Sequence, residues 1–307
     1  MVNQIQTNMS KITTERENSI SRCIFETDEI LPLDVNYLPE KFLVECENNC
    51  NETPENKIKG LTEIRKLLEA DKVTKGIQFQ DDFLRQYLRH TKYEAAPAFV
   101  KLRNFTNLRT NYNYLYLGVQ TEYTVIPSTK YSTVLPHRCP DGSLLFLLQL
   151  GKWNPNEMPF EDFARITFLL AIQALRHPLT QIAGMTFIVD FQNTGIRHLK
   201  YCTLQNIWLP YHVSLECMPV NYRGNYIING NFLMKLLWTM TKPILPEQFQ
   251  KLFIFLSSTE ELFNYLPRSI VPSEYGGYLE DYYMTDWLNK AHKQHQRFHK
   301  AGEPNFF

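Results

Sequence analysis

Three histidines near the C-terminus have the spacing of a helical metal site. His292, His295 and His299 lie three and four residues apart, so a helix would place them on one face. Imidazole nitrogens are common zinc ligands. Lysines and glutamines surround these histidines, however, which is typical of a solvated surface. We therefore interpret residues 281–307 as a polar, helical C-terminal tail and expect no metal and no cofactor.

The other residues that could support catalysis are isolated in the sequence. There is no glycine-rich dinucleotide motif, no P-loop, no nucleophile elbow and no HExxH zinc motif. Asp190 stands near the end of a predicted strand, where many open α/β sheets carry active-site residues, but no nucleophile or second carboxylate is near it. His198, near a predicted helix start, is more typical of a structural residue than of a base. We expect no catalytic residues and a protein that is not an enzyme.

The cysteines and the apolar runs give an indication of the cellular compartment of the protein. Six cysteines are scattered without a CxxC pair, and although Cys46 and Cys50 share a helical face, no further ligand nearby completes a zinc site. The first 20 residues lack the apolar stretch of a signal peptide, and no run approaches the ~18 apolar residues of a membrane span. We expect reduced thiols and a cytoplasmic protein.

Composition places the chain among ordinary globular proteins. Of 307 residues, 44% are hydrophobic and 21% are charged, so the chain can bury a large core without disulfides. Its 32 basic and 32 acidic residues cancel, which gives no reason to expect a nucleic acid partner. Aromatic residues make up 13% of the chain, which hints at an aromatic-lined interior. We expect a monomer.

Periodicity divides the chain into a helical part and an α/β part. Residues 1–26 lack periodicity and are interpreted as a flexible tail, and residues 27–112 as an N-terminal helical domain. Thr53 followed by Pro54 predicts a helix start, as does Asp81-Asp82, and Lys92-Tyr93 interrupts the pattern before Ala95.

Residues 113–280 alternate between predicted strands and predicted helices. The strands are 144–148, 185–191, 222–229 and 251–256, and the helices are 160–176, 198–217 and 232–241. Pro210 must kink or split the second of these helices. This alternation predicts an α/β fold with a mostly parallel sheet and right-handed crossovers.

The predicted helix 232–241 is apolar on nearly all sides, with Lys235 as its only charge. A helix of this kind must be fully buried or must face lipid. It is therefore either a central core helix or a mobile lid that covers an apolar cavity inside and touches membrane outside. In the second case we expect these residues to contact the membrane: Phe232, Leu236, Trp238 and Ile244.

Five short motifs occur in order along the chain. They are Asp82 to Arg89 (DFLRQYLR) with Lys92-Tyr93; Gly184 with Ile188-Val189-Asp190; Met218-Pro219, Arg223 and Ile227-Ile228-Asn229; Lys242 to Leu245 (KPIL); and Val271 to Gly277 (VPSEYGG). Through these motifs the chain resembles the CRAL-TRIO lipid-binding proteins, most of all their animal branch of tocopherol and retinal carriers. The resemblance covers about Leu38 to Tyr282.

The resemblance implies a helical N-terminal domain and a lipid-binding α/β domain whose pocket is closed by a helical gate. The gate falls on the apolar helix 232–241. The ligand-binding residues carried over from the family are Thr167, Phe168, Ala171, Met185, Phe187, Val189, Cys202, Val213, Met218, Val220, Tyr222, Leu233, Leu237 and Met240. Most are apolar, as a pocket for a hydrophobic ligand with one polar end requires.

The chain departs from the family where related carriers hold phosphoinositide headgroups. Thr91, Asn221, Gln248 and Leu252 occupy positions that the resemblance marks as basic. Amide and leucine side chains cannot supply the charge that an Arg or a Lys gives to a phosphate. Arg223 and Lys251 are near in sequence and are the weak phosphoinositide candidates.

These observations favour a carrier of a small hydrophobic lipid, such as a tocopherol-, retinoid- or other isoprenoid-like molecule, with transient peripheral contact at membranes. Two alternatives stay open. One is a protein that exchanges phospholipid or phosphatidylinositol, and the other is a protein-interaction module whose pocket is vestigial.

Overall fold

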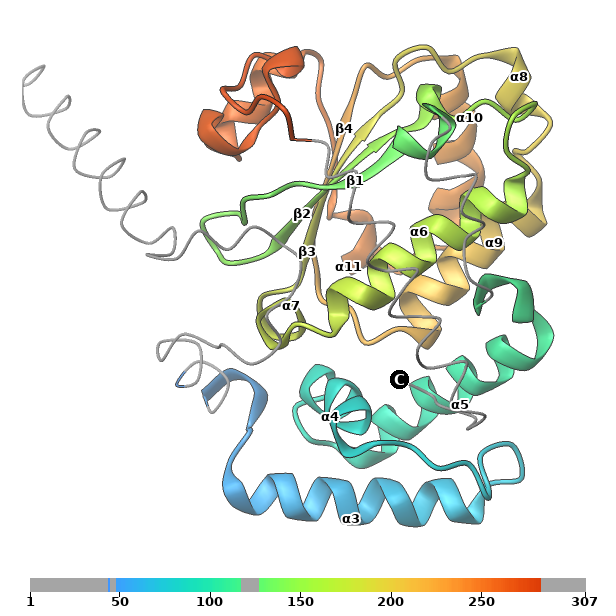
Figure 1. Ribbon diagram of the computed structural model, residues 1–307, viewed down its shortest axis with the longest axis vertical. Helices are drawn as coiled ribbons and strands as arrows, with labels where there is room; N and C mark the ends of the chain where they lie inside the picture. The colour runs from blue at the N-terminus through green and yellow to red at the C-terminus, as the bar shows by residue number, and fades with distance from the viewer. Residues whose placement is uncertain (1–43, 45–47, 117–126, 283–307) are drawn as a thin grey trace, which may run out of the picture.

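The structure of the chain, a computed structural model, describes residue 44 and residues 48–116 and 127–282. A layer of helices from the N-terminal part lies beneath a mixed α/β part (Figure 1). The tail predicted at 1–26, Cys46 and the three C-terminal histidines lie outside the described residues. So does most of the helical tail predicted at 281–307.

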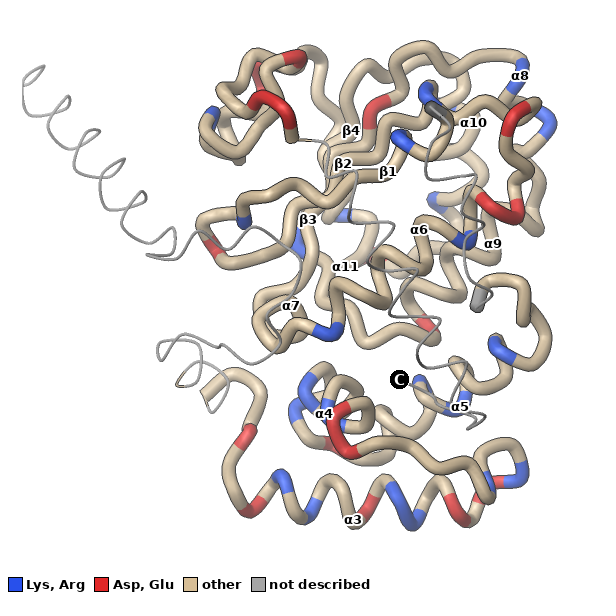
Figure 2. The backbone as a smooth tube through the Cα atoms, in the orientation of Figure 1, with Lys and Arg blue, Asp and Glu red and all other residues tan. Residues whose placement is uncertain are grey.

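The lower layer consists of α3 (Pro54–Ala70), α4 (Asp81–His90) and α5 (Ala95–Asn111). The predicted cap of α3 is confirmed, because the Thr53 side chain accepts a hydrogen bond of 3.2 Å from the Asn56 backbone N–H. Charges line α3 along its length (Figure 2), and only Gly60, Ile64 and Leu68 of this helix are buried. The lower layer therefore turns one charged face to solvent.

The sheet has five strands in chain order. They are β1 (Ser132–Val134), β2 (Leu144–Gln149), β3 (Met185–Asp190), β4 (Tyr222–Ile228) and β5 (Phe253–Phe255). β1 pairs antiparallel with β2, and every later pair is parallel. The predicted strands and the mostly parallel sheet are confirmed, and the short antiparallel edge strand β1 is an addition that no pattern in the sequence indicated.

Helices cover one face of the sheet and short turns cover the other (Figure 1). The α-helices of this part are α6 (Phe160–Leu175), α7 (Pro178–Ala183), α8 (Ile196–Leu199), α9 (Leu204–Tyr211), α10 (Phe232–Thr241) and α11 (Glu247–Gln250). Among the described residues, no helix is long and apolar enough to cross a bilayer. The C-terminal segment 259–279, red in Figure 1, packs its apolar side chains on the opposite face of the sheet.

The helix predicted at 198–217, which Pro210 was expected to kink or split, is divided into three parts, and its first break lies before Leu204 and not at Pro210. α8 ends at Leu199, and α9 restarts at Leu204 with Thr203 as its cap. Pro210 lies inside α9, and a π-helical turn, η5 (His212–Cys217), follows directly. Because proline lacks the N–H group and its ring crowds the preceding turn, a wider π turn at this point is the expected accommodation.

Asp190 ties the C-terminal motif to the end of the sheet. Its carboxylate accepts hydrogen bonds from the Tyr275 hydroxyl at 2.7 Å, from the Asn229 amide at 2.8 Å and from the Gln192 backbone N–H at 2.8 Å. Burial and the neighbouring carboxylate raise the pKa of Tyr275, which keeps its hydroxyl a donor. The aspartate that sequence analysis considered as an acid or base is thus fully engaged in holding two segments together.

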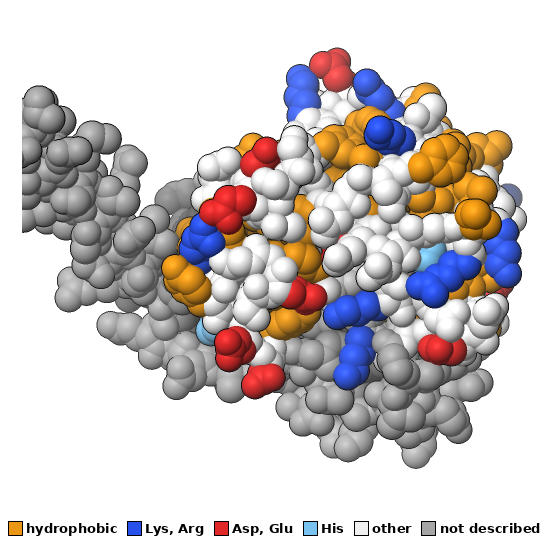
Figure 3. Space-filling view, turned by 90° about the horizontal axis from the view of Figure 1, so that it is seen from above, with side chains coloured by type: hydrophobic (Ala, Val, Ile, Leu, Met, Phe, Trp, Pro, Cys, Tyr) orange, Lys and Arg blue, Asp and Glu red, His pale blue; other side chains and the backbone are white. Residues whose placement is uncertain are grey.

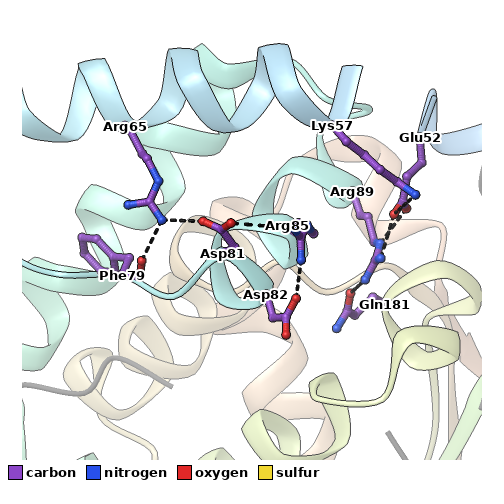
Figure 4. A network of polar contacts seen from close by, with 9 residues as sticks. All are labelled: Glu52, Lys57, Arg65, Phe79, Asp81, Asp82, Arg85, Arg89 and Gln181. Atoms are coloured by element: carbon purple, nitrogen blue, oxygen red, sulfur yellow. Dashed lines mark hydrogen bonds and ion pairs between the residues drawn. The ribbon is translucent and has the colours of Figure 1, made fainter. Parts of the chain in front are cut away.

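An ion-pair network attaches the two layers (Figure 4). The Arg89 guanidinium binds both Glu52 carboxylate oxygens, at 2.6 and 2.7 Å, and donates to the Gln181 side chain on α7 at 2.5 Å. Glu52 is only 4% exposed, so the pair is a buried bidentate one. His90 adds a contact of 3.0 Å to Asn221, the residue before β4. These bonds fix the helical layer against the base of the sheet.

We predict that Asp190→Asn destabilises the protein by about 2 kcal/mol, because an amide places a donor where only acceptors fit. Tyr275→Phe should cost about 1 kcal/mol. Gln192→Ala is the matched control, since it keeps the backbone donor, and should leave stability unchanged. Urea denaturation followed by circular dichroism measures all three. If Asp190→Asn is as stable as the wild type, the proposed structural role of Asp190 is wrong.

Candidate functional site

A cavity of about 420 Å³ lies between the sheet and the helices on its covered face. Residues of α6, α9, η5 and α10 form its sides and roof, and residues of β2 to β5 form its floor. The walls are mainly aromatic and aliphatic. Its volume falls within the range of about 300–1,000 Å³ that is typical of small-molecule sites.

One stripe of α6 faces the cavity. Its members follow the 3–4 residue spacing of a helix face and are Phe160, Phe163, Ala164, Thr167, Phe168 and Ala171. The two alanines leave space that larger side chains would fill. The Thr167 hydroxyl is 2.6 Å from the Tyr131 hydroxyl, which itself donates to the Phe163 carbonyl at 2.5 Å. This wall is therefore apolar, and its few hydroxyls are already bonded.

A row across the sheet forms the cavity floor. Phe146 pairs with Phe187, Phe187 with Asn225, and Asn225 with Phe253, on four neighbouring strands. All four side chains line the cavity. The Phe146 and Phe187 rings stack with their centroids 5.1 Å apart. The floor is thus aromatic with one amide in its centre.

The π-helical turn forms a second wall. Val213, Ser214 and Leu215 are consecutive, yet all three line the cavity, together with Pro210 and Tyr211. In a regular α-helix three consecutive residues point in different directions. The wider turn after Pro210 therefore presents a longer stretch of chain to the cavity.

The helix α10 closes the cavity with one edge. Leu237, Thr241 and Leu245, four residues apart, line the cavity. The Asn231 side chain caps the first turn by accepting from the Leu233 N–H at 2.9 Å, and its amide donates to the Phe191 carbonyl at 3.0 Å. The base of α10 is therefore fastened to the loop after β3.

The outer face of α10 carries apolar side chains next to the exposed polar residues Lys235 and Thr239. Phe232 is 71% exposed and Ile244, just beyond the helix, is 41% exposed. Trp238 is half-buried against Phe253 and Phe255, and Leu236 is also half-buried. Leu233 is the only buried residue of α10, so the alternative of a central core helix is wrong.

The structure brings many of the sequence-predicted ligand residues together. Those that line the cavity are Thr167, Phe168, Ala171, Phe187, Val213, Met218, Tyr222 and Leu237. They come from α6, β3, η5, the turn before β4, β4 itself and α10. The helix stripe and the strand alternation are sufficient to place them on one side of the sheet.

The remaining predicted ligand residues do not line the cavity. They are Met185, Val189, Cys202, Val220, Leu233 and Met240. Met185 and Val189 share the face of Phe187, but the cavity spans only the middle of β3. Cys202 lies in the break between α8 and α9, where a continuous helix was expected. Val220 faces a neighbouring cleft, and Met240 lies off the stripe of α10 that begins at Leu237.

Several wall residues were not predicted from the sequence. Phe146, Leu148, Phe160 and Phe163 follow from strand alternation and helix spacing once the cavity side of the sheet is known. Tyr131 lies in a short 3-10 turn, η3 (Pro127–Tyr131), and no periodic signal marks it. Among the described residues, no group of three or more His, Cys, Asp or Glu side chains has the arrangement of a metal site.

Comparison with known families agrees with this architecture. Residues 128–277, which span β1 to the C-terminal motif, match the family model described as CRAL/TRIO domain. This part of the chain is a CRAL-TRIO domain. The resemblance stated from the five motifs is therefore confirmed.

Relatives of this CRAL-TRIO protein are distant in sequence. A human alpha-tocopherol transfer protein-like protein is 21% identical over 252 residues, which cover 81% of this chain and 74% of the relative. Rat clavesin-1 is 23% identical over 241 residues, covering 77% of this chain and 68% of clavesin-1. A crystal structure of Sfh5 shares 13% identity, covers 85% of this chain and 99% of its own, and has a TM-score of 0.44.

A second, more polar cleft of about 600 Å³ lies between the helical layer and the CRAL-TRIO domain. It contains Asn221, Leu252 and Arg223 from the predicted phosphoinositide region. Lys251 is not part of its lining and pairs instead with Glu247 at 3.2 Å. Arg89, Lys92 and Lys101 also line this cleft, and sequence analysis did not name them for it.

The cations of the cleft are largely engaged by the protein itself. Arg89 binds Glu52, and Arg223 donates to the Ala183 carbonyl at 2.6 Å. Lys101 donates to the Leu215 carbonyl, and burial lowers its pKa. Burial and the nearby Lys101 lower the pKa of His90 to about 4, so at neutral pH this imidazole carries no charge. The cleft therefore offers less attraction for a phosphate than its number of basic residues indicates.

We predict weak, unselective binding to bisphosphorylated phosphoinositides. Sedimentation with vesicles that contain phosphatidylinositol bisphosphate should recover no more protein than vesicles with the same charge from phosphatidylserine. Leu252→Arg, which adds a cation to the cleft wall, should increase recovery on the phosphoinositide vesicles. Selective binding by the wild-type protein would refute the prediction.

Proposed function

We propose that this protein is a non-enzymatic carrier that binds one small hydrophobic lipid in the cavity and transfers it between membranes through movement of α10. The observation that carries the proposal is an apolar cavity of about 420 Å³ whose roof is an apolar, partly exposed helix. The match to the CRAL/TRIO family model supports it, and so does the similarity to the human alpha-tocopherol transfer protein-like protein. The ligand class is tocopherol-, retinoid- or other isoprenoid-like.

Burial of the ligand supplies the binding energy. Each Å² of apolar surface removed from water contributes about 25 cal/mol, so ~300 Å² contributes roughly 7 kcal/mol before ordering costs. A free energy of this size corresponds to a dissociation constant of about 10 μM. No reactive group is needed for this step, and the hydroxyls of the wall are already bonded to the protein.

The outer face of α10 gives the carrier a means of releasing its ligand. Exposed apolar residues next to the roof favour contact with the interfacial region of a bilayer. The neighbouring helix α9 contacts α10 and adds Leu204 and Trp208, which are 74% and 41% exposed. Hydrophobic side chains gather on the side of the molecule that carries α8 and α10, with Lys and Arg beside them (Figure 3). A membrane that binds the open form better shifts the population toward opening.

Phospholipid exchange is the second candidate function. Ser214, Tyr222 and Phe249 line both the cavity and the polar cleft, so a headgroup in the cleft and a chain in the cavity are geometrically compatible. The engaged cations of the cleft argue against it. A lipid extract of the purified protein separates the two functions, since the carrier predicts an isoprenoid-like species and the exchange protein a phospholipid.

We predict that Leu237→Asp lowers the rate of vesicle-to-vesicle transfer of NBD-labelled α-tocopherol at least tenfold, because a carboxylate in the roof opposes burial of an apolar ligand. Thr239→Asp is the matched control, since Thr239 is exposed on the same helix and lies outside the cavity wall. It should keep most of the transfer rate. Equal rates for Leu237→Asp and the wild type would count against a gate at α10.

A further inference from the structure

The amide of Asn225 is a buried polar group in the otherwise aromatic floor of the cavity. The residue is 8% exposed and lies in the centre of the aromatic floor, between Phe187 and Phe253 in the strand register. Its Nδ2 is buried and has no hydrogen-bond partner. A buried donor without a partner costs about 1–3 kcal/mol, so an apolar residue of similar size would be more stable here.

The other polar side chains of the wall have partners within the protein. Tyr131 binds Thr167 and the Phe163 carbonyl, Asn206 donates to the Tyr201 carbonyl, Tyr211 to Glu216, Thr241 to the Leu237 carbonyl, and Tyr222 bonds with Ser214. Within the described wall, Asn225 is thus the side chain whose buried polar nitrogen has no partner.

The backbone holds Asn225 in this position. Its N–H donates to the Leu252 carbonyl at 2.7 Å, and β4 is paired on both sides at this residue. The strand therefore cannot turn the side chain to the other face of the sheet. A half-turn about the Cβ–Cγ bond, which is a soft torsion, exchanges the oxygen and nitrogen ends of the amide. Either end is thereby available to a molecule that fills the cavity.

We propose that Asn225 selects lipids that carry an oxygen acceptor, such as a carbonyl, and donates a hydrogen bond to it from Nδ2. This inference rests on the proposed carrier function and narrows its ligand class. The remainder of the ligand is apolar, to match the aromatic floor and the α6 stripe. Pure hydrocarbons of the same length bind less well, because they leave the amide unpaired.

A competition experiment tests the selection. The full-length protein is equilibrated with vesicles that contain equimolar farnesal and farnesene, which share a chain and differ in the carbonyl. The lipids bound to re-isolated protein are then extracted and their ratio is measured by gas chromatography. Comparison of variants under the same conditions cancels the different partitioning of the two probes into the vesicles.

The expected result is that Asn225→Leu lowers the farnesal-to-farnesene ratio about tenfold relative to the wild type, the effect of one hydrogen bond in an apolar site. Gln173→Met is the matched control. Gln173 also has a buried, unpaired amide nitrogen, but it lies outside the cavity, so this variant should keep the wild-type ratio.

The possible results distinguish a failure of the inference about Asn225 from a failure of the proposed carrier function. If both probes bind and Asn225→Leu keeps the wild-type ratio, the amide serves an internal water or the fold, and the inference is overturned while the carrier function stands. If neither probe is recovered with any variant, both the inference and a carrier of isoprenoid-like lipids are overturned.

A second measurement needs no variant and so does not depend on the folding of Asn225→Leu. In the wild-type complex with farnesal, the carbonyl stretching band in the infrared spectrum should lie at lower wavenumber than in an alkane solvent. A band at the alkane position shows a carbonyl without a donor and contradicts the proposal.

Discussion

An apolar space can persist inside a protein only if the elements around it are held apart, and this constraint governs the CRAL-TRIO domain described here. The α6 stripe keeps alanines at two positions where larger residues would fill the cavity. The π turn after Pro210 spreads the facing wall. On the far side of the sheet, Asp190 fixes the C-terminal segment over a buried apolar cluster, whereas the helical face encloses the cavity.

The same constraint explains the composition of α10. A roof over an apolar space needs an apolar inner edge, and Leu237 supplies it. A roof that opens at a membrane also needs an outer face that tolerates lipid, and Phe232 and Ile244 supply that. The helix is consequently apolar nearly all round without being buried, a combination that an ordinary surface helix or core helix would not show. Because the hydrogen bonds of Asn231 hold the first turn of α10 in place, we expect the helix to pivot there during the proposed movement.

Much of this architecture could be predicted from the sequence, and the failures have physical causes. The cap at Thr53, the strands β2 to β4 and the bounds of α10 follow from local chemistry and periodicity. The break between α8 and α9 could not be foreseen, since apolar spacing continues across it and Thr203 is an ordinary residue until its capping bond is seen. The family resemblance placed Phe187 in the cavity wall, but it also selected Met185 and Val189 on the same strand face, because neither the resemblance nor strand alternation shows where along a strand a cavity ends. The role of Asn225 depends on a missing partner, and only three-dimensional neighbours reveal that.

The central claim, a hollow apolar interior that takes up one lipid, is tested most directly by native mass spectrometry of the purified full-length protein followed by organic extraction. The account predicts one adduct per chain, released on extraction as an apolar, oxygen-bearing lipid. It also predicts loss of that adduct in Ala171→Trp, which fills the space between α6 and the floor. A wild-type protein that stays free of adduct after incubation with vesicles of total cellular lipid would contradict the account.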